Sequence, residues 1–314
     1  MACFHPVTAY RSLIVNASGK RSLCFDPHKS LPGSELTIPC GKCKGCRVDR
    51  SQQWGTRLMH EKTYHRASCS LLITYDDEHL PEHGTLVPKH GKKFMKALND
   101  KFGPALREEF GQGVRYFYCG EYGDSTGRPH YHVILFGVDF SEDRKPWKKT
   151  KGGHQLFRSE TANRLWGKGN IDIGNVTHES CEYAARYVLK KVNGERAIEH
   201  YSRIDPATGE WYLLQPEFIR MSNRPGIGSR FFDDPANANM YARGGFPRRK
   251  SKNLKSIPKY YDRKLEKIDP ERLQAIKEQR KALALLRKAE NSPERLAVRE
   301  EVLEAKIKLL KREV

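Results

Sequence analysis

Two histidines separated by one residue form the pattern with the clearest chemical meaning in this sequence. His130-Tyr131-His132 lies in a run from Pro129 to Phe136 that is rich in aromatic and β-branched residues, which predicts a β-strand. Side chains at positions i and i+2 of a strand point to the same face, so both imidazoles face one way and Tyr131 faces the other. Two adjacent imidazoles suit a divalent metal ion.

The third ligand of such a site is expected from a neighbouring strand. Residues 114–119 predict a strand, and the turn-rich residues 120–129 predict that it joins the histidine strand in an antiparallel hairpin. Glu121 lies at the end of the first strand, so the hairpin brings its carboxylate towards His130 and His132. An ordinary polar face is the alternative for an isolated His-x-His, and the choice depends on what else the sequence supplies.

A pair of tyrosines supplies a candidate nucleophile. Residues 177 to about 192 predict a helix with Thr177 as its N-cap. Tyr183 and Tyr187 are four residues apart and share one helix face, which Lys190 borders. A phenol has an ordinary pKa of about 10, so a metal on the phosphate and a nearby lysine would have to assist it. Two aromatic core residues at helical spacing are the alternative.

Cysteines form the second concentrated group, at Cys40, Cys43 and Cys46. Two Cys-x-x-Cys steps that share Cys43 bring three thiols together, and zinc takes four such ligands in a tetrahedron. We prefer Cys3 as the fourth ligand. The other donors near the N-terminus are Cys24 and His5. Plain reduced thiols are the alternative to structural zinc, because the second paired knuckle of a standard zinc ribbon is missing.

The charge of the chain indicates a polyanionic partner. Lys and Arg number 57 against 38 Asp and Glu, a formal net charge of +19, which favours nucleic acid or an anionic membrane. No run of about 18 apolar residues predicts a transmembrane helix, and the first residues lack the apolar segment of a signal peptide. We therefore expect a cytoplasmic protein with reduced thiols that contacts nucleic acid and no membrane.

The elements that must position these groups alternate between helices and short strands. The predicted elements are a helix over residues 47–66, a strand over 70–75, a helix over 88–101 and strands over 114–119, 129–136 and 170–176. Two other motif matches are rejected. Gly123 to Gly127 matches a nucleophile elbow but leads into a strand instead of a helix. His60 to His65 has one residue too many for a zincin motif. Residues 221–228 predict either a phosphate-binding turn or a simple tight turn.

The C-terminal part of the chain changes character after about Tyr241. A basic segment that includes Arg248, Arg249 and Lys250 predicts a linker or an arm that touches DNA. Two helices follow from Asp269, with Ser292 as the N-cap of the second, and form a helical hairpin or short coiled coil. The predicted organisation is a Cys-rich segment with a helix over 1–66, a catalytic domain over 67–242, a basic linker over 243–268 and a helical hairpin over 269–314.

The histidine strand followed by a Tyr-x-x-x-Tyr-x-x-Lys helix resembles the HUH endonuclease superfamily. More narrowly, the chain resembles the replication initiators of gokushoviruses, single-stranded DNA phages of the microvirus family. The resemblance covers residues 1 to about 245 and includes the cysteine cluster, the hairpin from Gly120 to His132 and the segment Met221–Gly228. Tyr131 departs from the superfamily, which usually has an aliphatic residue there.

This resemblance implies an α+β fold with a central antiparallel sheet and flanking helices. It also implies a rolling-circle initiator, an endonuclease that nicks single-stranded or origin duplex DNA, forms a 5′-phosphotyrosine and later rejoins the strand. Leu71 to Tyr75 corresponds to the first family motif, and Tyr187 is ranked as nucleophile ahead of Tyr183, with Lys190 assisting and Lys191 near phosphate. Mg²⁺ or Mn²⁺ is the expected metal, host replication proteins are expected partners, and the host bacterial cytoplasm is the expected location. The sequence contains no P-loop, which agrees with a nickase that needs no ATP.

Two other functions remain open. A non-enzymatic, zinc-containing nucleic-acid-binding protein would explain the charge and the cysteines but leaves the histidines and tyrosines without a role. A metallohydrolase of small substrates that uses Glu121, His130 and His132 would explain neither the charge nor the tyrosines.

Overall fold

A computed structural model describes residues 3–17, 19–150, 152–186, 196–248, 251–286 and 288–309, without the side chains of 186, 196, 247–255, 288 and 309. Internal contacts divide the chain into two units. The larger unit is built on Ser51–Ile268, and the smaller combines Met1–Arg50 with Asp269–Arg312. Among the described helices, none has the length and apolar character that crossing a bilayer requires.

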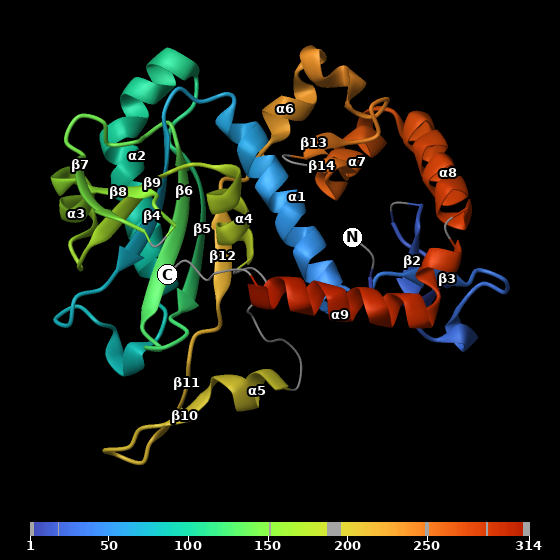
Figure 1. The fold of residues 1–314 in the computed structure, drawn as a ribbon, viewed down its shortest axis with the longest axis horizontal. Coiled ribbons are helices and arrows are strands. Elements are labelled where there is room, and N and C mark those ends of the chain that lie inside the picture. The colour runs from blue at the N-terminus through green and yellow to red at the C-terminus, as the bar shows by residue number, and fades with distance from the viewer. Residues whose placement is uncertain are drawn as a thin grey trace. The chain divides into compact units, whose positions relative to one another are not determined.

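A seven-stranded antiparallel sheet forms the centre of the larger unit (Figure 1). The strand order is β12-β5-β6-β4-β9-β8-β7. The strands are β4 (Ser68–Thr74), β5 (Arg115–Tyr122), β6 (Pro129–Phe136), β7 (Lys145–Lys149), β8 (Gln155–Arg158), β9 (Ile171–Asn175) and β12 (Phe218–Met221). This confirms the predicted fold class, and it puts β6, the histidine strand, between β5 and β4.

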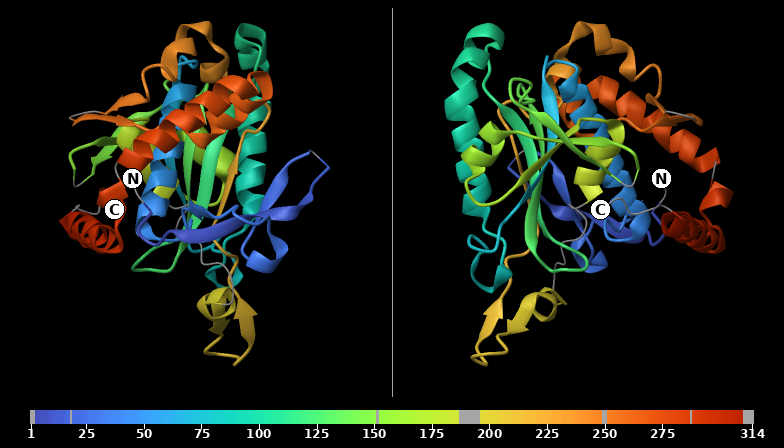
Figure 2. Two further views of the ribbon diagram at one scale, coloured as in Figure 1. Left: turned by 90° about the vertical axis from the view of Figure 1, so that its right-hand side faces the viewer. Right: turned by 60° about the vertical axis from the view of Figure 1, so that its left-hand side comes forward.

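Helices cover both faces of this sheet (Figure 2). One face carries α2 (Pro88–Phe110) and α3 (Glu160–Trp166), and the other carries α1 (Lys44–Lys62) and α4 (His178–Arg186). The predicted apolar face of α2 is buried. The helix nevertheless continues to Phe110, beyond the predicted end near residue 101, and stops at Gly111 in the left-handed conformation (φ 71°). Gly103 and Pro104 suggested an earlier end, but tertiary packing overrides that local preference.

Alternate residues of β6 enter two different cores. Tyr131 and Val133 pack in the core under α2, whereas Ile134 and Phe136 pack in the core under α1 and α4. His130 and His132 have the same parity as Ile134, so they lie on the α1 and α4 face. The Tyr131 hydroxyl donates to the carbonyl of Val87, 2.9 Å away. The prediction that the two imidazoles share one face and Tyr131 the other is confirmed.

A buried ion pair joins α1, the sheet and the turn at residues 221–228. Arg115 of β5 donates to the Glu61 carboxylate of α1 and also to the carbonyl of Pro225, at 2.9 Å. The amide of Gly228 donates to Oε2 of Glu61 at 2.6 Å. The amide of Gly228 is therefore bound within the protein, and this segment serves as a structural turn that leads into α6 (Ser229–Asp233).

The remaining elements of the larger unit lie mostly after α4. They are η2 (Glu82–Gly84), α5 (Arg196–Tyr201), β10 (Ser202–Ile204), β11 (Trp211–Leu213), η4 (Pro235–Met240), β13 (Phe246–Arg248), β14 (Ser251–Lys255) and α7 (Lys259–Ile268). Residues 243–268, expected as a basic linker, thus contain a hairpin and a helix. Tyr261 and Leu265 of α7 are buried, and the many charges of this segment concealed its apolar spacing.

The smaller unit contains a three-stranded antiparallel sheet of order β2-β1-β3 and the C-terminal helices. Its elements are β1 (Val7–Val15), β2 (Arg21–Cys24), η1 (Pro27–Lys29), β3 (Leu36–Ile38), α8 (Pro270–Leu286), η5 (Lys288–Asn291) and α9 (Pro293–Leu309). The two predicted helices are confirmed, and Ser292 accepts from the amide of Arg295 as an N-cap. Leu273 and Leu296 are buried, but Leu283 and Leu286 are exposed.

Candidate functional site

Three side chains converge at one end of the β5–β6 hairpin. Glu121 of β5 lies directly opposite His130 of β6 in the strand register. Its Oε1 atom is 2.8 Å from Nε2 of His130 and 2.9 Å from Nε2 of His132. The potential ligand atoms of the three residues all lie within 4.8 Å of one another. The structure thus brings together the three residues predicted as metal ligands.

The chemistry of this triad fits a divalent cation. Nδ1 of His130 lies 3.2 Å from the carbonyl of Arg128, which can only accept, so this nitrogen donates. A neutral His130 then turns the lone pair of Nε2 towards the Glu121 carboxylate, and two acceptors in contact need a proton or a metal ion between them. Two imidazole nitrogens and one carboxylate oxygen form a donor set typical of first-row divalent metals.

The Glu121 carboxyl is held in its charged form. Burial raises its pKa, but the hydrogen bonds with His130 and His132 outweigh burial and lower the pKa to about 2. A carboxylate that stays ionised at neutral pH attracts a cation into the space beside the two rings. The anionic ligand is therefore present throughout the physiological pH range.

Tyr183 of α4 lies against this triad. Its ring is 5.4 Å from the ring of His132, measured between centroids, and the two planes are nearly perpendicular at 84°. The helix begins where the sequence predicted, because the Thr177 side chain accepts from the amide of Ser180 at 3.1 Å. The opposite side of α4 is buried against the sheet core. One of the two predicted tyrosines is therefore next to the candidate metal ligands.

Contact between α1 and α4 fixes the position of Tyr183. A Cβ atom at Gly55 of α1 would lie only 2.7 Å from Cγ of Glu182, the residue before Tyr183. Ser51, one turn earlier in α1, donates its hydroxyl to the carbonyl of Glu182 at 2.9 Å. The glycine therefore permits a close approach of the two helices. In the sequence, Gly55 had only the aspect of an interruption in a helical pattern.

Several predicted site residues lie outside the described part of the chain. These are Tyr187, Lys190, Lys191, Arg249 and Lys250, together with the side chain of Arg248. Their proposed roles as nucleophile, phosphate contact and DNA contacts therefore remain predictions.

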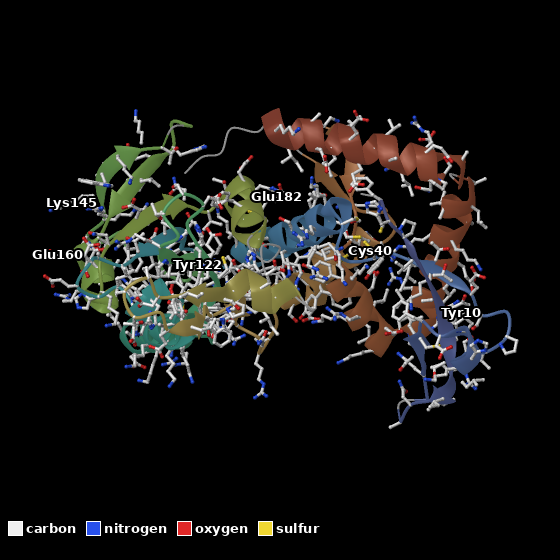
Figure 3. All side chains as sticks on the ribbon, turned by 90° about the horizontal axis from the view of Figure 1, so that it is seen from below. Tyr10, Cys40, Tyr122, Lys145, Glu160 and Glu182 are labelled. Carbon is white, nitrogen blue, oxygen red and sulfur yellow. The ribbon has the colours of Figure 1, made fainter. Side chains whose placement is uncertain are left out.

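The predicted cysteine group is assembled within the smaller unit. The thiols of Cys3, Cys40, Cys43 and Cys46 all lie within 4.8 Å of one another, and Figure 3 shows sulfur atoms gathered around Cys40. Burial raises the pKa of Cys43, but amide hydrogen bonds from Cys46 and Phe4 lower it to about 6. The other two donors considered for the fourth position have different partners. His5 pairs with Glu300 at 2.8 Å, and the Cys24 thiol donates to backbone carbonyls in its own loop.

A group of cations around an exposed tryptophan was not predicted. Asp172 of β9 binds Arg158 of β8 at 3.2 Å and Lys148 of β7 at 2.8 Å. The Arg158 guanidinium lies 4.0 Å from the ring centroid of Trp147, whose exposed fraction is 52%. The signal was present as Lys145-Pro-Trp147-Lys-Lys149, a basic run with an aromatic residue, but β7 has no alternating pattern that identifies a strand.

This cationic group shares the sheet face of the histidines. His132 pairs with Leu72 in the strand register, and Leu72 pairs with Asp172 on its other side. Residues directly opposite one another in neighbouring antiparallel strands point to the same face. The face that carries His130 and His132 therefore continues across β4 and β9 to Asp172, Arg158 and the edge strand β7.

Comparisons with known proteins identify the chain's relatives. A family model described as replication-associated protein ORF2 matches residues 68–192, a range that includes every element from β4 to α4. A replication-associated protein ORF2 of Spiroplasma virus 4 is 34% identical over 258 residues, covering 79% of this chain and 74% of that protein. No solved structure gives a significant match.

Two further relatives come from other phages. The replication-associated protein VP4 of Bdellovibrio phage phiMH2K is 36% identical over 193 residues, 61% of this chain and 59% of that protein. The replication-associated protein ORF4 of Chlamydia phage 1 is 32% identical over 170 residues, 53% of this chain and 41% of that protein. The predicted kinship with replication proteins of microvirus-like phages is confirmed. The chain belongs to the replication-associated protein ORF2 family.

Proposed function

We propose that this protein initiates rolling-circle replication of a phage genome as a metal-dependent DNA nickase and strand transferase of the HUH type. The observation that carries the proposal is the contact between Tyr183 and His132, since His132 also contacts Glu121. A phenol beside two imidazoles and a carboxylate suits attack on a phosphodiester bound at that point. Membership of a replication-associated family agrees with this role.

The proposed reaction is a pair of transesterifications. In the first, a tyrosine oxygen bonds to the phosphorus of the origin phosphodiester as the bond from phosphorus to the 3′ oxygen breaks. The phenol loses its proton, and the 3′ oxygen gains one and becomes a free hydroxyl. In the second, a 3′ hydroxyl attacks the phosphotyrosine and releases the tyrosine. Each step exchanges one phosphoester bond for another, so no ATP is consumed.

Glu121, His130 and His132 would hold a divalent ion, Mg²⁺ or Mn²⁺, that stabilises negative charge on the phosphate. The imidazole ligands favour Mn²⁺, and cellular abundance favours Mg²⁺. Tyr187 is proposed as the first nucleophile with Lys190 assisting, and Tyr183 as the second. Two tyrosines one helical turn apart can both reach a single phosphate site.

A covalent adduct with DNA tests this proposal. The protein, incubated with Mn²⁺ and a pool of single-stranded candidate origins, should give a protein–DNA band on a denaturing gel. Tyr183→Phe and Tyr187→Phe should each reduce the yield, and the double variant and His130→Ala should abolish it, because the nucleophile or a metal ligand is lost. Tyr10→Phe, in the smaller unit, is the matched control and should leave the band unchanged.

The result also separates the nickase from the second function. Binding of DNA without any adduct, across several metals and a broad origin pool, would support a non-enzymatic zinc-containing nucleic-acid-binding protein. An adduct that persists in the double tyrosine variant would show that another residue is the nucleophile.

We further propose that single-stranded DNA leaves the triad along the same sheet face and stacks on Trp147 at the edge strand β7. Trp147 offers an exposed ring, and Lys145, Lys148 and Arg158 supply positive charge near it. Cations track the phosphate backbone, while an aromatic ring stacks on a base of any sequence. This combination suits a strand held without reading its sequence.

Replacing Trp147 should therefore weaken binding of single-stranded DNA. Trp147→Ala should raise the Kd about tenfold, within the range of about 1–3 kcal/mol for one stacked base. Trp147→Phe, which keeps an aromatic ring, should recover most of the affinity. Fluorescence anisotropy with a labelled oligonucleotide measures both. An unchanged Kd for Trp147→Ala would exclude this strand as part of the binding path, and would leave the nickase proposal itself unaffected.

The site of action that follows from this proposal is the cytoplasm of the infected bacterium. The 3′ hydroxyl released at the origin is a primer, so a host polymerase and host replication proteins are the expected partners. The substrates are origin DNA in duplex and single-stranded form.

A further inference from the structure

We propose that the smaller unit binds one structural zinc ion through the thiolates of Cys3, Cys40, Cys43 and Cys46. This site is separate from the Glu121, His130 and His132 triad and does not depend on the nickase proposal. The four residues come from two places in the sequence, the N-terminal segment before β1 and the loop from β3 into the first turn of α1. A bound ion would join these two segments.

The distances between the sulfur atoms fit a single tetrahedral ion. Sγ of Cys3 lies 3.9 Å from Sγ of Cys43. A zinc–sulfur bond of about 2.3 Å in a tetrahedron puts neighbouring sulfur atoms about 3.8 Å apart. A disulfide would instead bring them to about 2.05 Å. An iron–sulfur cluster would separate the thiolates further, because several metal and sulfide atoms lie between them. One mononuclear ion is therefore the occupant that matches.

Backbone amides surround the sulfur atoms as they do in zinc knuckles. The amides of Lys42 and Cys43 donate to Sγ of Cys40 at 3.4 and 3.3 Å. The amide of Cys46 donates to Sγ of Cys43 at 3.5 Å, so the second Cys-x-x-Cys step repeats the arrangement of the first. Hydrogen bonds from amides stabilise thiolate charge and orient metal ligands. The loop is thus arranged to present charged sulfur to one point.

The N-terminal segment completes this set of amide–sulfur contacts. The amide of Phe4 donates to Sγ of Cys43 at 3.4 Å, and the amide of Cys40 donates to Sγ of Cys3 at 3.2 Å. The two segments therefore hold each other's sulfur atoms. Four protein thiolates fill the coordination sphere and leave no position for water or substrate, which is typical of a structural and not of a catalytic zinc.

The smaller unit also needs such a stabilising bond. Among its described residues, the buried apolar side chains other than cysteine are Phe4, Ala9, Leu273 and Leu296. Several larger apolar residues of its sheet, such as Ile14 and Phe25, are exposed. Small modules with so little core usually depend on a metal or disulfides for stability. A zinc ion between the N-terminal segment and α1 supplies that stability.

Metal analysis of the full-length protein tests this inference. Protein expressed with zinc in the medium, and purified without a metal-affinity column, should contain about one zinc per chain by mass spectrometry, as a single closed site requires. Cys43→Ser should lose that zinc. Cys24→Ser is the matched control, because Cys24 belongs to the same unit but lies outside the cluster, and it should keep the zinc. His130→Ala/His132→Ala should keep it too, which separates the two metal sites.

A spectroscopic measurement covers the case in which Cys43→Ser does not fold. Cobalt exchanged into the wild-type protein should give the intense visible bands of a tetrahedral ion and the ultraviolet charge-transfer band of four thiolates. Zinc far below one per chain, retention of zinc by Cys43→Ser, or a cobalt spectrum without thiolate bands would each overturn the proposal. Metal content and spectrum do not depend on DNA cleavage, so failure of the nickase would leave this test intact.

Discussion

Glu121→Gln is expected to reduce metal-dependent DNA cleavage by about 100-fold or more at a fixed Mn²⁺ concentration, since even second-layer ligand partners are worth about 10- to 100-fold. The substitution keeps the size of the side chain but removes the charge that contacts both His130 and His132. Because the Glu121 carboxyl has a pKa of about 2, the wild-type site carries this charge at neutral pH. The loss should act mainly through weaker metal binding.

A titration of cleavage rate against Mn²⁺ separates this cause from misfolding. The Mn²⁺ concentration at half-maximal rate should rise in Glu121→Gln, and high Mn²⁺ should recover part of the activity. Asp100→Asn, which removes an exposed acid of α2, is the control and should behave as wild type. A variant with the wild-type rate and the wild-type Mn²⁺ midpoint would exclude Glu121 as a ligand.

Glu61→Gln is expected to lower the free energy of unfolding by about 3–5 kcal/mol at neutral pH, the usual cost of leaving one member of a buried ion pair without its partner. Arg115 would keep a buried charge with no carboxylate beside it, and the turn at Gly228 would lose its ionic acceptor. Since whole domains have about 5–15 kcal/mol of stability, this loss is large. Urea denaturation followed by circular dichroism measures it.

The same residue predicts the direction of a pH effect. Burial raises the pKa of the Glu61 carboxyl, but hydrogen bonds from His65, Arg115 and Gly228 outweigh burial and hold the pKa below its ordinary value. The unfolded chain therefore binds this proton more readily than the folded protein. The stabilisation is complete above the unfolded pKa of about 4.3 and is lost as the pH falls through the lower folded pKa.

The wild-type protein should thus lose stability on acidification below about pH 5, and Glu61→Gln should show a flatter profile. Glu82→Gln is the control, because the Glu82 side chain is 89% exposed and such changes usually stay within about 0.5 kcal/mol. Equal acid sensitivity in wild type and Glu61→Gln would contradict the assigned role of this ion pair.

The local patterns of the sequence were sufficient to predict the strands around the site. The period-2 pattern of residues 129–136 assigned opposite faces to His130 and Tyr131, and the turn-rich residues 120–129 brought Glu121 opposite His130. Both inferences use only neighbours in one hairpin, where chain geometry leaves few alternatives. The α+β fold and the helix that carries Tyr183 followed from similarly local signals.

Contacts between distant segments were not accessible in this way. Nothing local to Gly55 indicates that it lies against Glu182, and nothing near Asp172 indicates that it shares a sheet face with His132 across β4. Likewise the amide of Gly228 could bind a phosphate or a side chain until Glu61 was found beside it. Each of these depends on which helices and strands pack together.

The sequence by itself therefore determined the chemical groups of this protein: two histidines on one strand face, an acid across the hairpin, a tyrosine on a helix and a cluster of thiols. The tertiary structure decided which groups meet, bringing Tyr183 to His132 and Cys3 to Cys43. The physical reason is that strand and helix periodicities fix side-chain directions over a few residues, whereas contacts between distant residues are set by packing of the whole core.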